Sequence, residues 1–171
     1  MTRHQLSSKE CIPYYQTYID QAGELGLMEG LKQNGETIIS FLESLTEEQF
    51  SYAYADDKWT IKELVQHIMD TERIFTYRAL CFARKDKTPL PGYDQDKYAN
   101  ACEANIRTKE SLLKEYKALR LATVSLFESF SDDMLLQFGN ASQSDISVRA
   151  LGFILIGHEN HHCKVIKERY I

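Results

Sequence analysis

The chain has 171 residues, of which 43% are hydrophobic and 26% charged, and its formal net charge is −5. These values fit one folded domain with a packed core and exclude a disordered chain. Acidic and basic residues are interspersed and the apolar runs are too short to cross a bilayer, so neither nucleic acid nor a membrane is the expected partner.

The N-terminal stretch MTRHQLSSKECIPYYQ has no apolar signal-peptide core, so we expect a cytoplasmic protein. Residues 1–171 are expected to form a single domain, with residues 1–10 as a flexible terminus. The cysteines are scattered and form no C-x-x-C pair, which favours free thiols over disulfides in a reducing compartment: Cys11, Cys81, Cys102 and Cys163.

The spacing of apolar residues predicts amphipathic helices along most of the chain. A short helix is expected over Ile12–Ala22, where the glycines of GELG end it. A long helix is expected over Leu27–Leu45, because its apolar residues recur at spacings of three, four and seven. Thr46–Gln49 has the sequence of a capping box that opens a short turn.

The second long helix is expected to begin at Thr60, which forms a capping box with Glu63, and to end near Lys85 at the turn formers of KDKTPLPGYD. A third helix is expected over Ala104–Phe130. A fourth, over Ile146–Tyr170, follows the turn-like stretch QFGNASQSD, and no segment has a strand pattern. Four long helices with one long connector predict an all-α four-helix bundle.

The last expected helix carries His158-Glu159-Asn160-His161-His162, which matches the H-E-x-x-H signature of zinc peptidases. Helical residues four apart project from one face, so His158 and His162 can chelate one metal ion. His158 and His161, three residues apart, are the competing pair. The apolar stripe of this helix favours His158 with His162.

A third candidate ligand is His67, which lies between Leu64 and Ile68 on the core face of the second long helix. A buried imidazole needs hydrogen bonds or a metal, because leaving it unpaired costs about 1–3 kcal/mol. Spacing alone leaves two interpretations open. One is a three-histidine metal site between two helices, and the other is a set of core histidines satisfied by hydrogen bonds.

The peptidase interpretation lacks a third ligand. In the longer zinc-peptidase motif, glycine and histidine would stand where this chain has Val165 and Glu168. Nine residues follow His162, so we expect no later helix to supply a glutamate. Glu159 points about 100° away from His158 on an ideal helix, so we expect it to be a bystander and not a general base.

Three stretches resemble the DinB superfamily of metal-binding helical bundles: DKWTIKELVQHIMDTERIFTYRAL, PLPGYD and VRALGFILIGHENHHCKVIKERY. The similarity runs from about Tyr14 to the C-terminus. The W-x-x-x-E-x-x-x-H core of the family and its terminal G-H-x-x-H-H pattern are both present, as Trp59, Glu63 and His67, and as Gly157, His158, His161 and His162.

The resemblance implies a bundle with a long crossover connection and a divalent metal ion (zinc, nickel or iron) held by His67, His158 and His162, with His161 as the non-ligand. Characterised relatives transfer thiols such as bacillithiol or mycothiol onto electrophiles. The implied function is therefore a metal-dependent thiol S-transferase or hydrolase acting on a small thiol and an electrophile. The alternative is a non-catalytic metal-binding or stress-related interaction module. A homodimer is also expected, since such bundles often pair.

Several side chains near His67 are candidates for supporting roles. Glu63 and Asp70 could orient a ligand imidazole through its second nitrogen, whereas Glu72 is expected on a solvated helix face. Trp59 is expected to pack as an anchor before the second long helix. Three further residues could help to bind an acidic thiol: Arg73, Arg78 and Tyr93.

Overall fold

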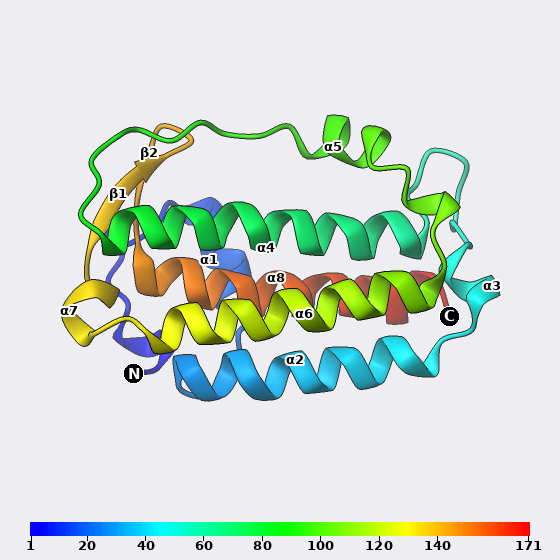
Figure 1. The fold of residues 1–171 in the computed structure, drawn as a ribbon, viewed down its shortest axis with the longest axis horizontal. Coiled ribbons are helices and arrows are strands. Elements are labelled where there is room, and N and C mark those ends of the chain that lie inside the picture. Colours follow the sequence, from blue (N-terminus) through cyan, green and yellow to red (C-terminus); the bar gives the residue numbers. More distant parts are fainter.

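The computed structural model describes residues 1–171 and forms a bundle of four long helices (Figure 1). Both α4 and α2 contact α6 and α8, so the four helices surround a shared interior. No helix combines the length and apolar character needed to span a bilayer. The predicted four-helix bundle is confirmed, and its long helices are α2 (Leu27–Ser44), α4 (Ile61–Ala83), α6 (Lys109–Glu128) and α8 (Val148–Arg169).

Polar caps set where these helices begin. At α4, the Thr60 hydroxyl accepts a hydrogen bond from the Glu63 N–H, and the Glu63 carboxylate accepts one from the Thr60 N–H at 2.8 Å. This is the predicted capping box. Helix α6 begins at Lys109, later than the expected Ala104, because Thr108 caps it through the N–H of Ser111.

The interior consists of two apolar clusters separated by a polar layer. One cluster packs the C-terminal part of α4 against the N-terminal part of α8, and the other packs the opposite ends of the same helices. Between them, buried polar side chains occupy the middle of three helices. This layer holds His67, Thr71 and Glu72 of α4, Arg120 and Thr123 of α6, and His158 and Glu159 of α8.

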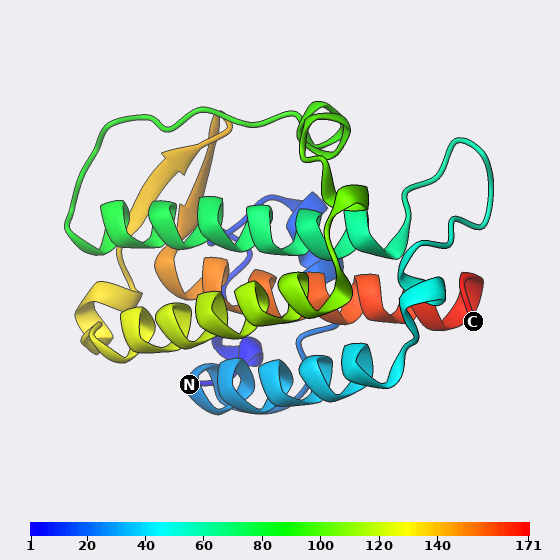
Figure 2. The same cartoon turned by 45° about the vertical axis from the view of Figure 1, so that its right-hand side comes forward.

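A long crossover joins the end of α4 to the start of α6 and runs along the outer side of α4 (Figures 1 and 2). It carries α5 (Gln95–Ala101), which contacts α4, and a short turn η2 (Ala104–Ile106). Because the crossover returns the chain to the end where α4 begins, α4 and α6 run in the same direction. The predicted long connection is therefore present.

A β-hairpin follows α6 and the short helix α7 (Asp132–Leu135), where we expected no strand. Strands β1 (Phe138–Ala141) and β2 (Ser144–Ser147) pair antiparallel. Their turn residues, Ser142 and Gln143, both have positive φ, as in a tight hairpin turn, but lack the usual Asn-Gly signal. Tertiary contacts hold the hairpin, since the crossover residue Leu90 hydrogen-bonds to both Asn140 and Ser142.

The N-terminal residues lie against the bundle, although we expected residues 1–10 to be flexible. The Met1 carbonyl accepts a hydrogen bond from the Leu27 N–H at 2.9 Å. The Glu10 carboxylate is buried and forms an ion pair with Arg149 at 2.6 Å. Helix α1 (Pro13–Ile19) then packs against α8 and places a group of tyrosines beside it.

Candidate metal centre

Three histidines from two helices converge in the polar layer. The Nε2 atom of His158 lies 3.1 Å from Nε2 of His67 and 3.0 Å from Nε2 of His162. A ligand nitrogen from each of the three lies within 4.8 Å of the others. Helix α8 supplies two of them one turn apart, and α4 supplies the third. The structure thus brings together the three residues that the sequence singled out.

His161 stays outside this group. It is half-buried, and its ring packs on the edge of Tyr18 at a centroid distance of 5.5 Å and on His162 at 5.1 Å. The competing pair, His158 with His161, is therefore not the pair that faces His67. The spacing of four along α8 selects the residues that meet α4.

Burial keeps the three imidazoles neutral. Desolvation lowers the pKa of His67 to about 4. Desolvation, assisted by the neighbouring His67 and His161, lowers the pKa of His162 to about 3. The pKa of His158 falls well below its usual value because burial and the other histidines oppose its protonation. Neutral imidazoles are the form that coordinates metal ions.

The donor set fits a borderline divalent metal ion. Two nitrogens each 2.0–2.1 Å from one tetrahedral ion stand about 3.3 Å apart. The two separations that involve His158, 3.0 and 3.1 Å, are close to this value, and His67 and His162 lie within 4.8 Å of each other. Imidazole nitrogen suits zinc, nickel and iron alike, so the donors do not select one of them. Aromatic rings close the site on two sides, with Trp59 at 5.0 Å from His67 and Tyr18 at 5.3 Å from His158, measured between ring centroids.

Glu159 and Glu72 occupy places that the sequence did not predict. Glu159, expected to be a bystander, is 1% exposed, and Glu72, expected to be solvated, is also 1% exposed. Both pair with the buried Arg120, whose Nη2 donates to Glu72 at 2.8 Å and also to Glu159. Glu159 further accepts hydrogen bonds from Tyr116 and, at 2.8 Å, from Asn34. The prediction for Glu72 was wrong because Arg120 of α6 faces it across the interior. Glu159 is no general base, as expected, but it lies in a stretch of α8 that is buried from Ala150 to Glu159 and belongs to this network.

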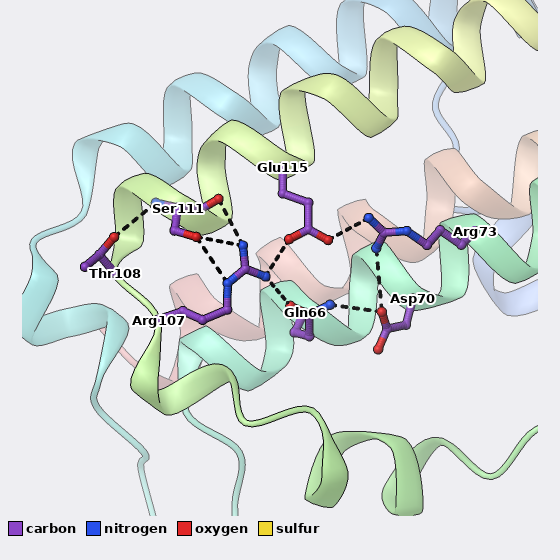
Figure 3. A network of polar contacts seen from close by, with 7 residues as sticks. All are labelled: Gln66, Asp70, Arg73, Arg107, Thr108, Ser111 and Glu115. Carbon is purple, nitrogen blue, oxygen red and sulfur yellow. Dashed lines mark hydrogen bonds and ion pairs between the residues drawn. The ribbon is translucent and has the colours of Figure 1, made fainter.

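The other acidic candidates near His67 bond elsewhere. Glu63 caps α4, as described above. Asp70 accepts a hydrogen bond from Gln66 at 2.9 Å and lies 3.7 Å from Arg73, which also pairs with Glu115 at 2.6 Å. Figure 3 shows this network between α4 and α6. Neither carboxylate orients the His67 ring, so the predicted supporting role is not observed.

A cavity of about 260 Å³ opens beside the histidines, and His158 forms part of its wall. Of the three residues considered for binding an acidic thiol, Arg78 and Tyr93 line this cavity, while Arg73 lies in the network of Figure 3. Helices α1, α4 and α8, the crossover and the hairpin turn together form the wall. The full lining is Tyr14, Tyr15, Tyr18, Thr71, Phe75, Arg78, Tyr93, Gln95, Ser142, Ile154 and His158.

Comparison with protein families places residues 31–166 on the model described as "DinB superfamily", a span that includes all three histidines. A curated relative from Oceanobacillus iheyensis is 33% identical over 135 residues, covering 78% of this chain and 75% of the relative. It is named "Putative metal-dependent hydrolase OB0413".

Two solved structures share the fold at low sequence identity. YfiT from Bacillus subtilis, described as "a probable metal-dependent hydrolase with an unusual four-helix bundle topology", superposes with a TM-score of 0.70 at 15% identity, over 96% of this chain and 90% of that one. A mycothiol-dependent maleylpyruvate isomerase gives 0.64 at 9% identity. There the match covers 99% of this chain but 63% of the isomerase.

Proposed function

The chain belongs to the DinB superfamily, and on this premise we propose that it is a metal-dependent enzyme that joins a low-molecular-weight thiol to an electrophilic substrate. One observation carries the proposal: the three histidines converge, and one of them, His158, also lines a cavity. Three protein ligands leave coordination positions for a small molecule, which is the arrangement of catalytic and not of structural zinc sites.

A divalent metal ion held by His67, His158 and His162 would lower the pKa of a thiol or water bound beside it. The protein positions the two reactants and excludes water from the site. The rings of Trp59 and Tyr18 flank the histidines, and the cavity lined by His158 would hold the second reactant. The transfer forms one carbon–sulfur bond, releases the thiol proton to solvent, and expels the leaving group with its electron pair.

The surroundings of Glu159 favour a thiol over water as the nucleophile. In zinc peptidases the glutamate of H-E-x-x-H serves as general base for water. Here Glu159 turns into the core, where Arg120, Tyr116 and Asn34 hold it. A thiol has an ordinary pKa of about 8.5, and a thiol coordinated to a metal ion would lose its proton near neutral pH without such a base.

Hydrolysis is the second candidate, because the Oceanobacillus relative, 33% identical, carries the name of a metal-dependent hydrolase. The same site could place a water molecule against an ester or amide. The two reactions differ in their product, since transfer consumes the thiol and hydrolysis does not. One assay can therefore separate them.

The test uses protein stripped with a chelator and reloaded with zinc, nickel or ferrous iron. Bacillithiol, mycothiol and cysteine are offered with 1-chloro-2,4-dinitrobenzene, and 4-nitrophenyl acetate is offered without thiol. We expect metal-dependent thioether formation that is lost in His67→Ala and retained in the matched control His161→Ala. Release of nitrophenol without thioether formation would establish hydrolysis instead. Metal-dependent stability with no turnover of either kind would overturn the proposal in favour of a non-catalytic metal-binding module.

A further inference from the structure

The cavity beside His158 contains a buried cation that has no carboxylate partner. Arg78 is 3% exposed. Its hydrogen-bond partners are neutral: Nη2 donates to the Pro91 carbonyl at 2.9 Å and to the Ser142 hydroxyl at 3.2 Å, and the Tyr15 hydroxyl is a further partner. Burying a guanidinium without a counter-charge costs several kcal/mol. Arg78 therefore differs from an ordinary buried arginine in having no carboxylate side chain beside it, and this needs an explanation.

The other well-packed arginines show what this chain normally provides. Arg120 is 4% exposed and pairs with Glu72 and Glu159. Arg149 is held by Glu10 at 2.6 Å. In both cases carboxylates from another part of the chain neutralise the guanidinium. A guanidinium carries five N–H donors, so the bonds to Pro91, Ser142 and Tyr15 leave Arg78 with donors for a molecule in the cavity that it lines.

The remaining cavity wall is neutral and aromatic. Its lining includes no Asp or Glu, but four tyrosines and Phe75, over whose ring Arg78 lies at 5.2 Å. Burial raises the pKa of Tyr15 and of Tyr93, and the charge of Arg78 offsets part of that rise. Both hydroxyls therefore stay neutral at pH 7. A small anion with an apolar or aromatic body matches this wall.

The helix geometry points Arg78 toward the histidines. His67, Thr71, Phe75 and Arg78 follow one another at helical spacings of four, four and three along one face of α4. The Cα atoms of His67 and Arg78 stand about 16 Å apart along the axis. The Arg78 guanidinium lies over the ring of Phe75, one turn nearer to His67, as expected for long helical side chains, which lean toward the helix N-terminus. One small molecule in the cavity can therefore lie between Arg78 and His158, which both line it.

We propose that Arg78 binds the carboxylate of the reactant that occupies this cavity, and that the enzyme therefore acts on small carboxylic acids. The inference rests on the proposed function, in that the reacting group of the same molecule lies at the histidines. The cavity, at about 260 Å³, is slightly smaller than the ~300 Å³ at which pockets for drug-sized ligands begin, so the acid is small. The carboxylate can belong either to the thiol or to the electrophile.

The test measures binding to metal-free protein, so that a metal ion cannot attract the acid. 3-Phenylpropionate is titrated by calorimetry, with 3-phenylpropanol as its uncharged counterpart. We expect the acid to bind at least tenfold more tightly than the alcohol, and Arg78→Met to abolish that preference. Arg78→Lys keeps the positive charge but loses the planar guanidinium, which can donate two parallel hydrogen bonds to a carboxylate. This variant should retain part of the preference for the acid over the alcohol. Arg73→Gln removes the same charge from α4 outside the cavity and should leave it unchanged.

Two results would overturn the inference. Absence of binding by the acid, or equal binding of acid and alcohol, would show that the cavity does not select carboxylates. A preference that survives in Arg78→Met, with the melting temperature lowered, would show that Arg78 only anchors Pro91 and Ser142. Neither result bears on whether the three histidines bind a metal ion, because the binding is measured on metal-free protein. Failure of metal uptake would leave the acid preference standing, so the two proposals can fail separately.

A second measurement on metal-loaded protein identifies which reactant carries the carboxylate. 3-Mercaptopropionate is compared with 2-mercaptoethanol as the thiol, and 4-chloro-3-nitrobenzoate is compared with its methyl ester as the electrophile. If the carboxylate belongs to the thiol, 3-mercaptopropionate has a lower KM than 2-mercaptoethanol in the parent; if it belongs to the electrophile, 4-chloro-3-nitrobenzoate has a lower KM than its methyl ester. In that pair, Arg78→Met raises the KM of the acid and leaves the KM of the uncharged compound unchanged. A KM unchanged by Arg78→Met in both pairs would contradict the proposal.

Discussion

Arg120 on α6 forms an ion pair with Glu159 on α8, the residue that directly follows His158. The same guanidinium pairs with Glu72 on α4 at 2.8 Å, so one side chain links three helices in the middle of the bundle. Burial raises the pKa of the Glu159 carboxyl, and Arg120 opposes that rise. The pair therefore fixes how α8 faces α4 at the level where the three histidines meet.

We predict that Arg120→Met lowers the free energy of unfolding by about 3–5 kcal/mol, because it leaves two buried carboxylates without their counter-charge. Urea unfolding measures the change. Lys117→Met on the same helix is the control, since its ion pair with Glu43 is about half exposed. Such exposed pairs contribute less than about 1 kcal/mol. Equal losses in the two variants would refute a special role for the buried network.

Gly157 lets α1 pack directly on α8. A Cβ atom there would stand 1.7 Å from the Tyr18 carbonyl oxygen, which is backbone and cannot turn aside. We predict that Gly157→Ala displaces α1 and costs about 1–3 kcal/mol despite the better helix propensity of alanine. Proteolysis within residues 1–22 should accelerate in parallel. Gly26→Ala is the control for the clash, because its Cβ would lie 3.4 Å from the nearest atom. It loses only the preference for glycine at the N-cap of α2, so proteolysis within residues 1–22 should stay at the parent rate.

The Glu10–Arg149 pair gives stability that depends on pH. Burial raises the pKa of Glu10, but hydrogen bonds from Arg149, Ser7 and Ser147 lower it further, so the folded value lies below the ordinary 4.5. The contribution of the carboxylate is thus complete above about pH 4.5 and disappears as the pH falls through the lowered pKa.

We therefore predict that Glu10→Gln costs about 2 kcal/mol from pH 7 down to about pH 4.5, and progressively less from there to pH 3. Urea unfolding of parent and variant across this range gives the difference directly. Glu110→Gln, an exposed substitution at the start of α6, should stay within about 0.5 kcal/mol of the parent at every pH. A cost for Glu10→Gln that is independent of pH would contradict the assignment.

Local signals were enough to predict the long helices and their histidines. The capping box of Thr60 and Glu63 fixed the start of α4, and the spacing of His158 and His162 fixed the face of α8 that meets it. The hairpin was missed because its strands are four residues each, and its turn lacks glycine and asparagine. Contacts with Leu90 of the crossover, remote in sequence, hold it in place.

The roles of Glu72, Glu159 and Arg78 could not be read from periodicity. A charged residue on a helix is normally solvated, and the exceptions depend on which residue of another helix faces it. Arg120 meets Glu159 across 39 positions of sequence. Arg78 acquires its place only when the crossover brings Pro91 and the hairpin brings Ser142 beside it. One signal was present in the sequence: Glu159 follows a long apolar stretch of α8, and a charged residue in such a stretch indicates a buried ion pair.

Metal binding by His67, His158 and His162 is tested most directly by measuring zinc stoichiometry and affinity in the parent, His67→Ala and His161→Ala proteins. We predict one zinc ion per chain in the parent and in His161→Ala. His67→Ala should bind zinc more than about a hundredfold more weakly, beyond the 10–100-fold effect of residues outside the coordination shell. Equal affinity in all three proteins, or no zinc bound by the parent, would contradict the metal centre and the function built on it.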